Sequence, residues 1–72
     1  MKIEKERKAS GLLKAELARR NISNEDLRLA LSKIGVEKTR ENIGKTINSG
    51  KFSFVFFLEC AEAINLEKIY LE

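Results

Sequence analysis

A chain of 72 residues has room for one domain with one modest core. It is 43% apolar and 35% charged, contains no proline and is rich in helix-forming residues, so we predict a single all-α domain. The net charge of +3 is unevenly distributed, since residues 1–51 contain 13 Lys and Arg against 7 Asp and Glu, whereas residues 52–72 contain one Lys against four Glu. The basic part suits a polyanionic partner, although an ordinary mixed-charge helical surface gives a similar pattern.

Several classes of function lack the residues that they need. One cysteine and no histidine exclude an internal disulfide and a Cys/His zinc site, so we expect no metal and no cofactor. No nucleophile has an evident base and no glycine-rich phosphate loop is present, so we expect neither an enzyme nor a small-molecule substrate. The first eight residues are too charged for a signal peptide and the apolar run at 54–58 is too short for a membrane span, so we expect a cytoplasmic protein.

The first predicted helix begins at Ser10 or Gly11 and ends near Asn21, with Leu13 and Leu17 on one face. Residues 1–9 are expected to form a charged arm or a helical extension, and residues 10–72 form the domain. Basic residues alternate with glutamates in this arm, so a solvated helix end and an arm that follows DNA are both compatible with it.

A second helix has the clearest start signal in the sequence. Ser23 is a preferred N-cap residue, and Asp26 stands three positions later, where it can complete a capping box. We therefore predict a helix from Asn24 to about Ile34, followed by Gly35 in the left-handed conformation that ends helices.

The third predicted helix follows the N-cap residue Thr39 and ends at Gly50. Its apolar stripe contains only Ile43 and Ile47, so most of its surface faces outward. Gly44 lies within this helix, where its missing side chain either admits a neighbouring helix or phosphate, or is merely tolerated.

A fourth helix is predicted after Ser53, and residues 66–71 suggest a short fifth helix. The expected inner face of the fourth helix comprises Phe54, Phe57, Leu58, Ala61 and Ile64. A second apolar stripe lies beside it, and we expect a homodimer through Phe56, Cys60, Ala63, Ile69 and Tyr70. The alternative is a fourth helix that is buried on all sides.

Two short helices joined by a glycine turn, the second with a thin buried stripe, resemble the helix-turn-helix of Cro and lambda-repressor-like domains. The resemblance rests on residues 22–27, the Gly35-Val36 turn and the segment from Ile43 to Lys51. It implies a compact bundle of about five helices, with the third in the major groove. Residues 13–65 more closely resemble the bacterial domain of unknown function 6471, which implies no activity. The connection from Gly35 to Thr39 is longer than in the common pattern, which leaves the register of DNA contacts open.

The resemblance implies a homodimeric transcriptional regulator that reads double-stranded DNA with the helix at about 40–48. Asn suits adenine, Lys suits guanine, and a helix N-terminus suits a phosphate. The expected DNA-binding residues are Lys38, Thr39, Arg40, Asn42, Lys45, Thr46, Asn48 and Lys51. The alternative is a small helical protein-interaction module without DNA binding, which should show apolar or aromatic anchors on the outer face of this helix.

Overall fold

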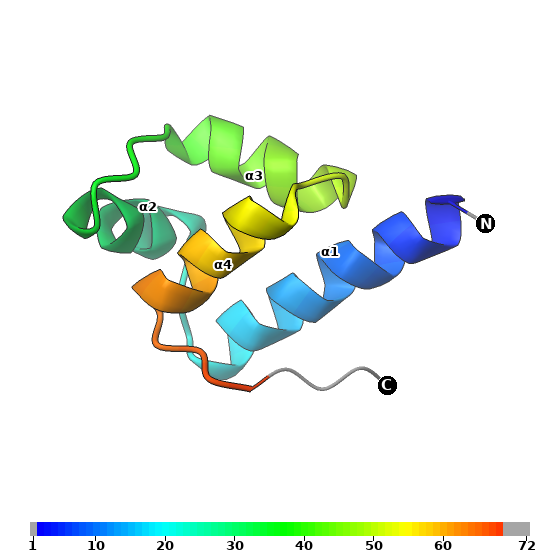
Figure 1. Cartoon of the computed structure of the whole chain (residues 1–72), viewed down its shortest axis with the longest axis horizontal. Helices are drawn as coiled ribbons and strands as arrows, with labels where there is room; N and C mark the ends of the chain where they lie inside the picture. The colour runs from blue at the N-terminus through cyan, green and yellow to red at the C-terminus, as the bar shows by residue number, and fades with distance from the viewer. Residues whose placement is uncertain (1, 69–72) are drawn as a thin grey trace.

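The computed structural model describes residues 2–68, in which four helices and no strands are found (Figure 1). The helices are α1 (Lys2–Arg19), α2 (Asn24–Lys33), α3 (Arg40–Ser49) and α4 (Phe54–Ala63). The predicted all-α class is confirmed. Residues 66–68 are not helical, and the rest of the expected fifth helix lies outside the described residues. None of the four helices combines the length and the apolar character that a membrane span requires.

The last three helices begin where the N-cap residues predicted. The hydroxyl groups of Ser23, Thr39 and Ser53 each accept a hydrogen bond from the backbone N–H three residues later, at 3.0 Å. Asp26 returns a bond by accepting the N–H of Ser23 at 3.1 Å, which completes the capping box of α2. These bonds satisfy helix-end amides that have no partner within their own helix.

The helix ends agree with the glycine signals. Gly35 follows α2 with φ +87°, and Gly50 caps α3 with φ +69°, both in the left-handed region that glycine adopts without strain. The start of α1 differs from the prediction, because the helix already begins at Lys2 and continues without a break through Ser10 and Gly11. The charged N-terminal segment is thus the first half of α1.

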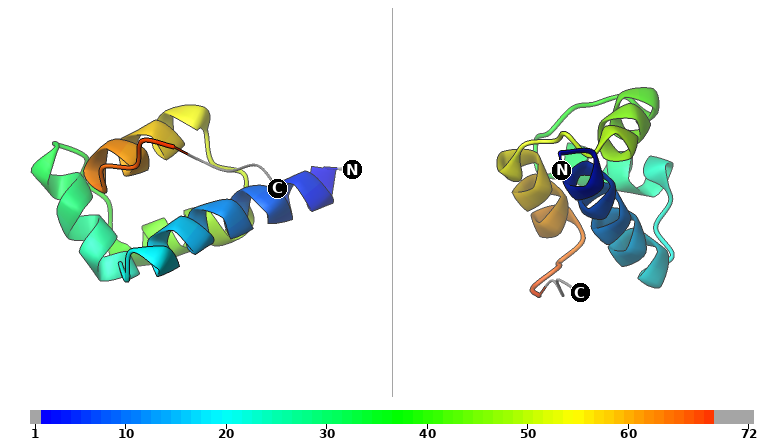
Figure 2. Two further views of the ribbon diagram at one scale, coloured as in Figure 1. Left: turned by 90° about the horizontal axis from the view of Figure 1, so that it is seen from below. Right: turned by 90° about the vertical axis from the view of Figure 1, so that its right-hand side faces the viewer.

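The core lies where α3 packs against α1 and α2, and where α4 packs against α2. Each helix contributes one stripe, and the stripes predicted for the first and third helices are buried. The buried apolar residues are Leu13, Leu17, Leu27, Leu31, Ile43, Ile47, Phe56, Cys60 and Ile64. Figure 2 shows α4 on one side of the molecule, whereas α3 lies alongside α1 on another.

The prediction for the inner face of α4 was right for Ile64, which is buried, and for Phe57, which packs against the core, but wrong for the start and middle of the helix. Phe56 and Cys60 are 5% and 0% exposed, whereas Phe54 and Leu58, which were expected inside, are 71% and 50% exposed. Phe52 explains this rotation of the helix. It precedes α4, packs against the core and places its ring 5.7 Å from that of Phe56, so that the helix enters with Phe56 facing inward.

This rotation corrects the residues expected at a dimer interface. Phe56 and Cys60 belong to the core of one chain, and Ala63 is half-buried against it, so none of the three forms an open apolar surface. Ile69 and Tyr70 lie outside the described residues.

Candidate nucleic-acid interface

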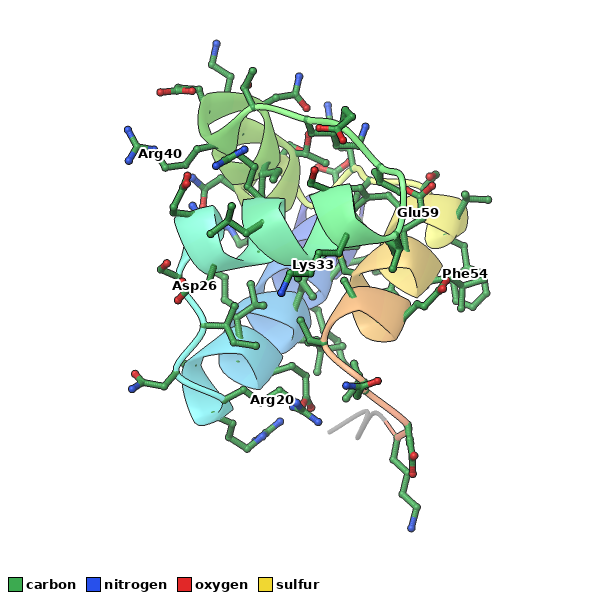
Figure 3. The ribbon with its side chains drawn as sticks, turned by 90° about the vertical axis from the view of Figure 1, so that its left-hand side faces the viewer. Arg20, Asp26, Lys33, Arg40, Phe54 and Glu59 are labelled. Atoms are coloured by element: carbon green, nitrogen blue, oxygen red, sulfur yellow. The ribbon has the colours of Figure 1, made fainter. Side chains whose placement is uncertain are left out.

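Helix α3 turns a polar face outward. Its two isoleucines, Ile43 and Ile47, are buried, and the side chains expected to meet DNA are exposed, apart from the half-buried Lys38 and Thr46. The exposed members of this set are Thr39, Arg40, Asn42, Lys45, Asn48 and Lys51. Figure 3 shows Arg40 projecting away from the molecule at the start of the helix. One continuous surface therefore joins the loop before α3, the helix and the residue after its cap.

Gly44 marks a close approach of α2 to α3. A Cβ atom at this position would lie 3.3 Å from Nδ2 of Asn24, the first residue of α2. A methyl group at this position would therefore meet only the movable end of the Asn24 side chain, so α2 comes close to α3 here without requiring a glycine.

The N-terminal end of α3 combines a free helix end with cations. The Thr39 hydroxyl accepts the N–H of Asn42, while the N–H groups of the two preceding residues still point out of the helix end. The ammonium group of Lys38 lies 5.8 Å from the centre of the Phe56 ring, which gives this side chain a preferred position. Shallow clefts flank this end, and Lys38 and Thr39 line both of them.

Carboxylates neutralise part of the positive charge around that end. Arg28 donates two hydrogen bonds to Glu25, at 2.9 and 2.6 Å, and these bonds hold the pKa of the Glu25 carboxyl below its ordinary value. Arg40 lies 3.6 Å from Glu41. Phosphate binding at this end would therefore depend mainly on the helix amides and on Lys38.

The middle and the end of α3 carry polar side chains with fewer ion pairs and hydrogen bonds within the protein. Lys45 and Lys51 form no ion pair, and Asn48 makes no side-chain hydrogen bond, within the side chains that the structure describes. Thr46 donates a long hydrogen bond of 3.4 Å to Oδ1 of Asn42, which leaves the Asn42 amide hydrogens as donors. Lys45 and Asn48 therefore have the most open hydrogen-bonding capacity on this face of the helix.

The first half of α1 joins this surface, which the sequence alone did not predict. The backbone of Glu6 lies against Gly50, and a cleft lined by Lys5, Glu6, Gly50 and Lys51 forms where the two helices meet. Two lysines from distant parts of the sequence thus flank one cleft at the end of α3. The charge run at residues 2–8 was the available signal, but its position beside Gly50 depends on a long-range contact.

A comparison with known protein families gives a match over most of the chain. The sequence profile of the Domain of unknown function (DUF6471) matches residues 6–69. The chain belongs to the DUF6471 family. This confirms the closer of the two resemblances and assigns no activity. No curated protein and no solved structure matches the chain, and the resemblance of this DUF6471 chain to Cro and lambda-repressor-like domains stays a prediction.

Proposed function

We propose that this DUF6471 protein binds double-stranded DNA and regulates transcription, with α2 and α3 acting as a helix-turn-helix. The observation that carries the proposal is the outer face of α3. It presents amide, hydroxyl and ammonium groups, and no large apolar side chain of this helix is exposed. A protein-docking helix would present apolar or aromatic anchors there, whereas DNA requires hydrogen-bonding groups.

The dimensions and the distribution of groups are suitable for a major groove. An α-helix with its side chains is about 10–12 Å across, and the major groove is about 12 Å wide. With α3 in the groove, Lys45 would address guanine and Asn48 adenine. Lys5 and Lys51, which flank the cleft between α1 and the end of α3, would contact phosphates. The backbone N–H groups at the N-terminal end of α3, next to Thr39, would do the same.

The alternative, a protein-interaction module, is favoured by a different observation. Phe54, Val55 and Leu58 are exposed on α4, and apolar side chains of this kind suit a protein partner rather than DNA. They lie on another helix than the polar face of α3, so a protein contact at α4 is compatible with DNA binding at α3. The two functions are therefore tested separately.

The decisive experiment is fluorescence anisotropy with a duplex selected from a sequence library and with a random duplex, over a salt series. Lys45→Ala should cost about 1–3 kcal/mol on the selected duplex and much less on the random one, because Lys45 would contact a base. Lys51→Ala should weaken binding to both duplexes alike and reduce the salt slope by about one unit. The matched control is Lys33→Ala, which removes an exposed lysine from α2 at a distance from Arg40 and the start of α3 (Figure 3). It should change neither quantity.

Two results would contradict the proposal. Equal losses on both duplexes for Lys45→Ala and Lys51→Ala would leave only nonspecific attraction between a basic surface and DNA. The absence of any binding at low salt would favour the protein-interaction module.

A further inference from the structure

Helix α4 exposes an apolar face that the fold of one chain does not use. Phe54, Val55 and Leu58 are 71%, 64% and 50% exposed. The ring of Phe54 stacks on that of Phe57, with centroids 6.1 Å apart and planes at 19°. Figure 3 shows Phe54 projecting from α4 away from the rest of the molecule. The stacked pair is a rigid aromatic anchor, which loses little conformational freedom on binding.

The charges of α4 are arranged against its own helix dipole. Its first turn contains no acidic residue and its last turn no basic residue, whereas Glu59 and Glu62 lie in its second half. Carboxylates are unfavourable near a helix C-terminus and favourable near an N-terminus. A partner helix that runs antiparallel to α4 would place each Glu62 beside the N-terminus of the other helix and remove the conflict.

We propose that this face of α4 is a self-association surface, on which a second copy of the chain docks its own α4 in antiparallel orientation about a two-fold axis close to Leu58. Leu58 then meets its own counterpart, and Phe54 of one chain lies opposite Glu62 of the other. A second copy of the chain supplies both an apolar surface and the complementary charge, because Glu62 near the C-terminus of each α4 lies beside the N-terminus of the other α4. The interface replaces the one expected from Phe56 and Cys60, which are buried.

The size of the face sets the strength of the contact. Even the largest apolar patches on monomeric proteins cover only about 300–600 Å². Two such patches bury less than about 1,200 Å² in total, which is the range of weak, transient complexes. We therefore expect a dimer whose dissociation constant is between about 1 and 100 µM.

Self-association does not depend on the proposed DNA binding. Figure 2 shows α4 on a different side of the molecule from α3, so the outer face of α3 is not part of the contact. The measurements below contain no DNA. A failure of one proposal is therefore distinguishable from a failure of the other.

The first test is sedimentation of the full chain over a concentration series from about 5 to 300 µM, which brackets the expected dissociation constant. The native chain should pass from monomer to dimer. Leu58→Glu should raise the dissociation constant at least about tenfold, because it places two carboxylates opposite each other on the two-fold axis. The matched control is Leu29→Glu, which changes a leucine of α2 with a similar exposure of 46% and should leave the transition unchanged. Circular dichroism melts confirm that both variants are folded.

The second test determines the orientation. In an antiparallel pair, Leu58→Cys should form a disulfide with itself, and Phe54→Cys should form one only when mixed with Glu62→Cys. The native Cys60 is fully buried and does not interfere. Glu62→Lys should weaken the dimer about two- to fivefold at low salt, because the lysine would lie at the N-terminus of the partner helix. Glu62→Gln separates the two arrangements: it removes the favourable charge from an antiparallel pair and weakens it, whereas in a parallel pair it would relieve repulsion between facing glutamates and strengthen the dimer.

Several results would overturn the proposal. These are a native chain that stays monomeric over the whole concentration range, a dimer that survives Leu58→Glu, and a dimer that Leu29→Glu abolishes equally. A chain that dimerises only after removal of residues 69–72 would show that its own C-terminal segment occupies the face. Self-coupling of Phe54→Cys, together with a stronger dimer in Glu62→Gln, would reject the antiparallel arrangement.

Discussion

Gly50→Ala tests the contact that holds the first half of α1 against the end of α3. Gly50 has φ +69°, and a Cβ atom on it would overlap the carbonyl group of Glu6 and lie 2.9 Å from its Cα. A side chain in the left-handed region costs about 1–2 kcal/mol. Displacing the backbone of α1 adds about 1–3 kcal/mol, as overpacking does elsewhere. The sum of about 2–5 kcal/mol is a large part of the stability of about 4–11 kcal/mol that a chain of this length has.

The two contributions can be separated with Gly35→Ala as the matched control. Gly35 also has a positive φ, of +87°, but a Cβ atom there meets nothing within 4 Å. It should therefore cost only the conformational part, about 1–2 kcal/mol. Urea unfolding followed by circular dichroism gives both values.

Removal of residues 1–8 completes the test, because it deletes Glu6 and with it the overlap. In the shortened chain, Gly50→Ala should cost no more than Gly35→Ala. If the two glycine variants were already equal in the full chain, the first half of α1 would not lie against Gly50, and Lys5 would not share a cleft with Lys51.

Three further outcomes follow from single residues. Gly44→Ala should raise stability by up to about 1 kcal/mol in urea unfolding, because alanine favours the helix and the Asn24 side chain can move from the new methyl; a loss would show that it cannot. Burial raises the pKa of the Cys60 thiol to about 12, so a thiol reagent at pH 8 should label the unfolded chain and leave the native chain unlabelled, and equal rates would contradict this. Hydrogen bonds from two arginines lower the pKa of Glu16 in the folded chain, so its contribution to stability is present above pH about 4 and is lost as the pH falls through that lowered pKa. Glu16→Gln should therefore reduce the loss of stability in acid, measured by urea unfolding at several pH values. An unchanged loss would show that Glu16 is not its cause.

Local signals in the sequence were sufficient for most of the helix boundaries. Ser23, Thr39 and Ser53 start helices because their hydroxyl groups satisfy backbone amides only three residues away, and Gly50 ends α3 through its own φ. Such features depend on a few neighbouring residues. The polar face of α3 could also be predicted from the sequence, because Ile43 and Ile47 alone define the buried side of this helix.

Two features could not be predicted because they depend on packing that the local pattern of residues does not determine. Helix α4 is apolar on more than one face, so its periodicity allowed two rotations, and the ring of Phe52, outside the helix, selects the one with Phe56 inside. The charged start of α1 has a composition that suits an arm or a helix. Its place beside Gly50, more than forty residues away, brings Lys5 to the candidate interface.

The apolar character of α4 also matters when the chain is not folded. Residues 52–58 contain four phenylalanines, a valine and a leucine, with neither a charge nor a proline, which is the composition of segments that assemble into cross-β fibrils. Lys51 and Glu59 bracket this segment and act as gatekeepers, since a charge at each end opposes stacking of unfolded chains. Variants that weaken the fold will therefore be lost to aggregation on heating, and those that also neutralise a gatekeeper will be lost soonest. For this protein, unfolding by denaturant at low concentration measures stability more faithfully than a thermal scan.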